Sequence, residues 1–197
     1  MSASGIRWKE GAVYGVTAYL VSFVFSAVFF YLDHLGTSLE RSDASASETV
    51  ALVTTIFHNG QFVRSQLSDP NATLSNAPLC GTLRCLEFFG AEQEMLFVPA
   101  YHVIPPLVLL GIGALAAYVV EPADRRGAAL SGASLAVGYA AAMLAIVFVF
   151  RLAVGFEIDL GMAAVAGLAY PMVFGTVGGL IGNEVFGTPS PSGTATS

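Results

Sequence analysis

The chain has 197 residues, of which 55% are hydrophobic and only 11% are charged. Soluble domains carry about 25% charged residues, so this composition indicates a protein that lies in lipid. The net charge of −6 argues against a nucleic-acid-binding protein, which needs a basic surface. Because Lys9 is the only lysine, the acidic balance suggests a salt-loving archaeon, the alternative being an ordinary acidic loop.

Four uncharged apolar stretches predict an all-α fold, an integral membrane bundle of about four transmembrane helices. The stretches cover residues 11–32, 95–120, 128–150 and 160–182, and a helix of such length crosses a hydrocarbon core of about 30 Å. The first is long for a signal peptide, so we expect a retained anchor. In the second, Pro105 and Pro106 predict that the regular helix starts near Pro105 or is kinked there.

The basic residues predict the orientation of this membrane domain, residues 11–186. Arg7 and Lys9 precede the first stretch, and Arg125 and Arg126 lie between the second and third. Short loops rich in Lys and Arg stay in the cytoplasm, so both termini, 1–10 and 187–197, should be cytoplasmic. The tail 187–197 should be disordered, because it consists mainly of Gly, Pro, Ser, Thr and Ala. The loop 33–94 should then be extracellular.

A short amphipathic helix is expected in this outer loop. Ser45 and Glu48 have the spacing of a capping box, and Asn59-Gly60 is a plausible helix end. Apolar residues between them recur on one helical face: Val50, Leu52, Val53, Ile56 and Phe57. The helix should lie on the outer membrane surface or cap the bundle, and the alternative is a face that binds a partner.

Small residues four positions apart predict close helix packing, because membrane helices associate through such contacts. The pairs are Gly11 and Gly15, Ser22 and Ser26, Gly175 and Gly179, and Gly178 and Gly182. Packing within the chain's own bundle is favoured over a dimer seam or a pore lining. Pro171 beside Tyr170 indicates a kink rather than a broken helix at a substrate site. No Asp, Glu, Lys or Arg interrupts a stretch, which weakens a transporter reading.

The outer loop also carries candidate modification and ligand sites. Cys80 and Cys85 are the only cysteines, and a structural disulfide is favoured over a redox-active pair, because no second pair exists to pass electrons on. Asn71 begins an N-glycosylation triplet. The histidines, His34, His58 and His102, and Asp33 could bind zinc or copper. They are more simply the hydrated ends of helices, because no tight ligand spacing links them.

The segment Thr54–Val63, with the sequence TTIFHNGQFV, offers a family resemblance. Its aromatic–x–Asn–x–x–Phe–Val pattern after a first span, followed by a proline-bearing second span, resembles a group of haloarchaeal multi-pass membrane proteins of unassigned function. The likeness covers the chain from Arg7 to about Glu184. It implies a haloarchaeal plasma-membrane location and supplies no activity or catalytic residues.

The sequence shows no phosphate-binding glycine loop, nucleophile elbow or zinc-protease motif. We therefore expect no enzyme, no catalytic residue, no cofactor and no metal. The leading hypothesis is a non-enzymatic accessory or envelope component of the plasma membrane, whose acidic outer loop binds a membrane-protein partner or a second copy. The alternative is a small transporter or channel subunit with its path between the Gly-rich third and fourth spans. A thiol or metal enzyme of the outer face is a distant third.

Overall fold

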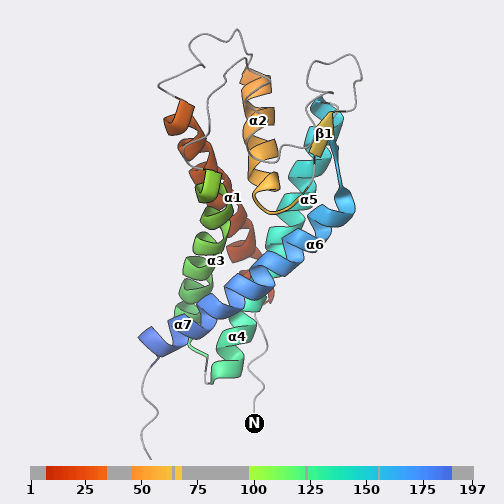
Figure 1. Ribbon diagram of the computed structural model, residues 1–197. Helices are drawn as coiled ribbons and strands as arrows, with labels where there is room; N and C mark the ends of the chain where they lie inside the picture. Colours follow the sequence, from red (N-terminus) through yellow and green to blue (C-terminus); the bar gives the residue numbers. More distant parts are fainter. Residues whose placement is uncertain are drawn as a thin grey trace, which may run out of the picture.

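The computed structural model describes residues 8–34, 46–63, 65–67, 98–122, 124–154 and 156–187. Four of its helical segments are long and apolar enough to cross a membrane, which confirms the prediction of a helical protein with four such segments (Figure 1). The helices are α1 (Trp8–His34), α2 (Ala46–Asn59), α3 (Val98–Val120), α4 (Arg125–Ala133), α5 (Leu135–Val154), α6 (Leu160–Tyr170) and α7 (Thr176–Phe186).

Two of the four spans are built from more than one helix. Between α4 and α5, Ser134 keeps helical angles (φ −63°, ψ −17°), so the span runs from Arg125 to Leu152. A π-helical turn, Pro171–Gly175, joins α6 to α7, and this span runs from Leu160 to Phe186.

The second span departs from its expected start. The helix α3 begins at Val98 and continues through Pro105 and Pro106. Of the two predicted alternatives, a start near Pro105 is therefore wrong, and a kink at this position stays a prediction. Pro105 lacks the N–H that would bond to the carbonyl of Tyr101, and Gly60 packs against this carbonyl. Prolines survive inside membrane helices where neighbouring protein surrounds the freed backbone groups.

Two aspartates define helix starts at opposite ends of the bundle. Asp124 accepts a 2.7 Å hydrogen bond from the N–H of Gly127 at the start of α4. Asp159 accepts a 3.0 Å bond from the N–H of Met162 at the start of α6. Both side chains satisfy N–H groups that have no partner within the helix.

The four spans pack against one another, mainly through α1, α3, α5 and α7. The helix α1 contacts α5 and α3, α7 contacts α3 and α4, and α6 contacts α5. The core contains aromatic and aliphatic side chains, with Tyr19, Leu135, Tyr139 and Met143 among the fully buried ones. Many large apolar side chains remain exposed along every span, as expected of surfaces that lipid covers.

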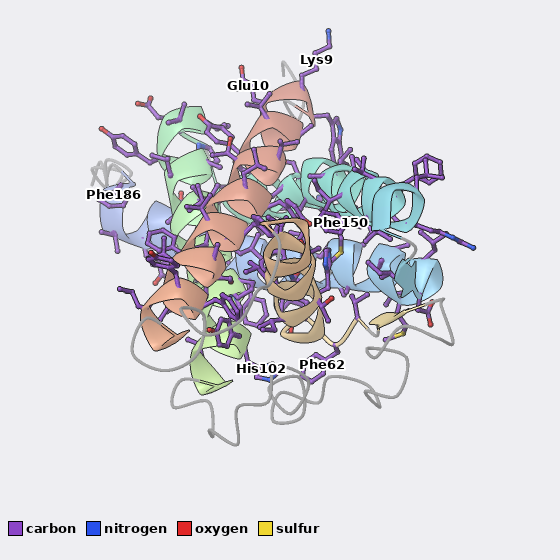
Figure 2. All side chains as sticks on the ribbon, turned by 90° about the horizontal axis from the view of Figure 1, so that it is seen from above. Lys9, Glu10, Phe62, His102, Phe150 and Phe186 are labelled. Atoms are coloured by element: carbon purple, nitrogen blue, oxygen red, sulfur yellow. The ribbon has the colours of Figure 1, made fainter. Side chains whose placement is uncertain are left out.

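The helix α2 is inserted between spans and does not lie flat on a surface. Figure 1 shows its lower end between α1 and α5, about halfway down the bundle, and Figure 2 shows it with α1 on one side and α5 and α6 on the other. Its C-terminal half is buried continuously from Val53 to His58, while Val50 nearer its start is 48% exposed. A helix on a membrane surface would bury only one face, so α2 packs inside the chain's own bundle.

After α2, a short β-ladder connects the chain to the far end of α5. The strands β1 (Ser65–Leu67) and β2 (Phe156–Ile158) pair antiparallel, with Gln66 opposite Glu157. This pair, which the sequence analysis did not foresee, fixes the segment after α2 to the α5–α6 connection. Several predicted features lie outside the described residues: Asn71, Cys80, Cys85, Ser45, residues 1–7 and the tail from residue 188.

Candidate functional site

The inserted helix ends in a tight turn, residues 58–63, in the middle of the bundle. The N–H groups of Gln61 and Val63 both donate to the carbonyl of His58, at 2.9 and 3.0 Å. Phe62 adopts a left-handed conformation (φ 62°) and is 67% exposed, between the buried Gln61 and Val63. The side chain of Phe62 therefore points outward and lies against the ring of His102 (Figure 2).

His58 is fully buried, and its two ring nitrogens have different partners. Its Nδ1 lies 2.8 Å from the backbone carbonyl of Thr54, and its Nε2 lies 3.1 Å from the hydroxyl of Tyr19. A carbonyl only accepts, so Nδ1 carries the proton. Burial lowers the pKa of His58 to about 4, so the ring is neutral, and Tyr19 donates to Nε2.

Gln61 forms the second link between the turn and a span. The hydroxyl of Tyr139 donates a 2.7 Å hydrogen bond to its Oε1, and its Nε2 donates to the carbonyl of Phe57 at 3.4 Å. Both side chains are buried. Tyr19 and Tyr139 also contact each other edge to face, with ring centroids 5.3 Å apart, a favourable geometry for aromatic pairs.

The carbonyl of Gly60 receives donors from the other two spans. Nδ1 of His102 donates to it at 2.9 Å, and the hydroxyl of Tyr170 lies 3.5 Å away. Residue 60 must be glycine, because a Cβ there would lie 2.6 Å from the carbonyl oxygen of Tyr101. This close approach places the carbonyl of Gly60 within reach of both donors.

Each of the four spans therefore contributes one hydrogen-bond donor to the same turn: Tyr19, His102, Tyr139 and Tyr170. Two of these, Tyr19 and Tyr139, lie near the middle of their spans. The hydrogen bonds are internal, and each partner is a group of the turn or of α2. We call residues 58–63 with these four donors the central polar turn.

Of the four residues considered as metal ligands, only His58 and His102 have described side chains; those of Asp33 and His34 lie outside the described part of the chain. His58 and His102 reach the same turn, but each uses a ring nitrogen to donate to a backbone carbonyl. Among the described residues no group of three His, Cys, Asp or Glu could hold a metal ion. His58 is also not the hydrated end of a helix, since it is fully buried.

The predicted small-residue pairs of the fourth span face two different neighbours in the same chain. A Cβ at Gly178 or Gly182 would lie 2.2 or 2.5 Å from a backbone oxygen of α3. A Cβ at Gly175 or Gly179 would lie 2.6 or 2.3 Å from a backbone oxygen of α4. Along these glycines the backbones of the fourth span and its neighbours are therefore in contact.

The π turn at Pro171 stands next to one of the four donors. Pro171 cannot donate a backbone hydrogen bond, and the turn widens the helix directly after Tyr170. Turns of this kind inside α-helices are frequent at functional sites. Here it positions Tyr170, whose hydroxyl reaches toward Gly60.

Sequence reasoning named His58 and His102 as candidate ligands, Tyr170 as the neighbour of Pro171, and Gln61 as part of the segment Thr54–Val63. It missed Tyr19 and Tyr139, and it did not predict that Gln61 and Tyr170 form hydrogen bonds at the turn. The available signal was a tyrosine in the middle of an uncharged apolar stretch, because a buried Tyr hydroxyl needs a partner. That signal does not say which residue the hydroxyl contacts. Ser26, also buried in the first span, has no hydrogen-bond partner among the described residues.

A comparison with protein families identifies the relationship of this chain. A family described as a family of unknown function, DUF7978, matches residues 1–185. The chain belongs to the DUF7978 family. The match includes the whole central polar turn of this DUF7978 protein. No curated protein matches the chain, and no solved structure matches it.

Proposed function

We propose that this DUF7978 protein is a non-enzymatic, multi-pass accessory or envelope component of a haloarchaeal plasma membrane. The observation that carries the proposal is the central polar turn, in which one donor from each span binds the inserted helix. Such internal pairing stabilises a single packed arrangement. It suits a protein that presents a fixed surface better than one that opens a path.

In the proposed topology, the end of the bundle with Arg125 and Arg126 faces the cytoplasm and both termini lie on that side. The acidic loop 33–94 then lies outside, where Cys80 and Cys85 would form a structural disulfide and Asn71 would be accessible to glycosylation. We propose this loop as the surface that binds a membrane-protein partner or a second copy.

A charge-neutral variant of the loop tests this surface. Replacing Glu87, Glu92 and Glu94 by Gln keeps side-chain size and leaves the described helices unchanged. We expect proteins that co-purify with the wild type from native membranes to be lost in this variant, while its thermal midpoint stays the same. Co-purification that does not change would contradict the proposal for the loop.

A small transporter or channel subunit is the second candidate, and a specific observation favours it. The structure combines buried polar side chains near the middle of the spans with a π turn at Pro171–Gly175, and membrane transporters use interrupted helices at their binding sites. In this candidate a solute would pass the central polar turn, because the helix backbones are already in contact along Gly175, Gly178, Gly179 and Gly182.

Flux measurements distinguish the two candidates. For the accessory protein, liposomes containing the purified chain should leak protons and potassium no faster than empty liposomes. Flux that exceeds this background, and that changes when Gln61 is replaced by Ala, would establish the second candidate and overturn the first.

A further inference from the structure

A pocket of about 130 Å³ lies at the end of the bundle opposite α2 and remote from the central polar turn. It is formed where α3 and α7 end side by side (Figure 1). Its walls include Tyr118, Glu121 and Pro122 from one chain segment and Asn183, Phe186 and Gly187 from the other. Neither the membrane topology nor the proposed function accounts for this pocket.

The two helices run in the same direction, so both C-termini meet at the pocket. Their contacts keep a constant offset along the chain: Leu110 with Gly178, Ala114 with Gly182, and Tyr118 with Phe186. The last four carbonyls of a helix have no partner within it, and each helix C-terminus carries about half a negative charge. Two such ends side by side create a negative potential at the pocket.

Glu121 adds a full negative charge to this end. No described residue pairs with its carboxylate, and the nearby Arg125 is already bound to Glu184. Glu121 also holds a left-handed backbone conformation (φ 49°), where glycine is the usual residue after a helix. A glutamate therefore stands, with backbone strain, at a position where a glycine would fit without it.

The remaining walls favour an organic ammonium over a bare metal ion. Tyr118 and Phe186 contact each other edge to face at 5.3 Å, and aromatic rings attract ammonium groups. The side-chain oxygen of Asn183 can accept N–H hydrogen bonds. So can the helix-end carbonyls other than those of Ala117 and Asn183, which already accept from the N–H groups of Glu121 and Gly187. The pocket volume also accommodates a short carbon chain together with the charged group.

We propose that this pocket binds a primary ammonium group, which either the head group of an aminophospholipid or a soluble amine could supply. The carboxylate of Glu121 neutralises the charge. The helix carbonyls and Asn183 accept the N–H bonds, which a trimethylated ammonium cannot donate. Because the pocket lies at the end of two spans, at the depth of lipid head groups, a lipid can reach it directly.

The test compares the wild-type full chain with Glu121→Gln, which removes the charge and keeps the size. Asp159→Asn is the matched control, because it removes a carboxylate at the opposite end and asparagine still caps α6. In the first arm, native mass spectrometry counts phosphatidylethanolamine and phosphatidylcholine retained from equal mixtures. In the second arm, ethylammonium and tetramethylammonium are added in detergent and the thermal midpoint is measured.

We expect the wild type and Asp159→Asn to retain phosphatidylethanolamine at least tenfold more than Glu121→Gln does, with no such difference for phosphatidylcholine. A thermal midpoint that ethylammonium raises in the wild type and in Asp159→Asn but not in Glu121→Gln, without a lipid preference, identifies a soluble amine as the source. Equal behaviour of wild type and Glu121→Gln in both arms, or equal binding of the methylated compounds, overturns the proposal. Glu121→Gly, which relieves the backbone strain, gives the same answer should Glu121→Gln fold poorly.

Discussion

At the scale of single residues, the hydrogen bond between Tyr139 and Gln61 is the shortest that binds the inserted turn to a span. Tyr139→Phe removes the donor and leaves the Oε1 of Gln61 buried without it. An unsatisfied buried acceptor costs about 1–3 kcal/mol, so the free energy of unfolding in detergent should fall by that amount. Tyr118→Phe, at an exposed residue, should change it by less than about 0.5 kcal/mol.

His58 makes the stability of the protein depend on pH. Burial lowers its pKa from 6.5 to about 4, so between these values the unfolded chain binds a proton that the folded chain does not. Stability is complete above pH 6.5 and falls as the pH falls toward 4.

Lowering the pH from 7.5 to 5 should therefore cost about 2 kcal/mol of unfolding free energy. The measurement is denaturation at both pH values for the wild type and for His58→Asn, which has no titrating group. An equal loss in the two proteins would show that other groups cause the pH dependence.

At the scale of helices, the glycine contacts of the fourth span decide how closely it packs. Gly178→Ala would place a Cβ 2.2 Å from the carbonyl oxygen of Leu110, whereas Gly111 on α3 has open space around its Cβ position. We expect Gly178→Ala to destabilise the bundle by about 2 kcal/mol, as overpacking does. Gly111→Ala should leave the stability unchanged or raise it by up to about 1 kcal/mol. Thermal unfolding of both variants in detergent gives the comparison.

The sequence predicts the helices of this protein better than their depth in the bundle. Hydropathy locates the four spans because lipid requires long uncharged helices. It cannot locate α2, since Thr54, His58 and Gln61 look like surface residues until Tyr19 and Tyr139 supply their partners. The sequence does not predict the π turn for a similar reason. Pro171 indicates an irregularity in the helix, but the neighbouring helices determine its form.

At the scale of the whole molecule, an apolar surface surrounds a mainly apolar core that also contains buried polar groups. Large apolar side chains are exposed along the spans, while His58, Gln61 and Thr54 are buried. Lipid accounts for the first observation. The inserted helix accounts for the second, because its polar groups find partners in all four spans. The sequence therefore identified the residues of the turn, at Thr54–Val63, but not the donors that converge on them.

The membrane topology is the prediction on which the proposed function depends. Arg125 and Arg126 begin α4 at one end of the bundle, whereas β1 lies near the other end (Figure 1). In the sequence, Cys80 and Cys85 come between β1 and α3. With an even number of spans, basic residues kept in the cytoplasm place both termini there and the cysteines outside.

Membrane-impermeant thiol labelling of intact cells tests this arrangement. After mild reduction, the native Cys80 and Cys85 should react from outside. A cysteine at Arg126, in a chain with both native cysteines replaced by serine, should react only after the cells are lysed. Arg126 is exposed, so burial in the protein would not explain a lack of reaction. Labelling at position 126 in intact cells would reverse the orientation and move the acidic loop into the cytoplasm.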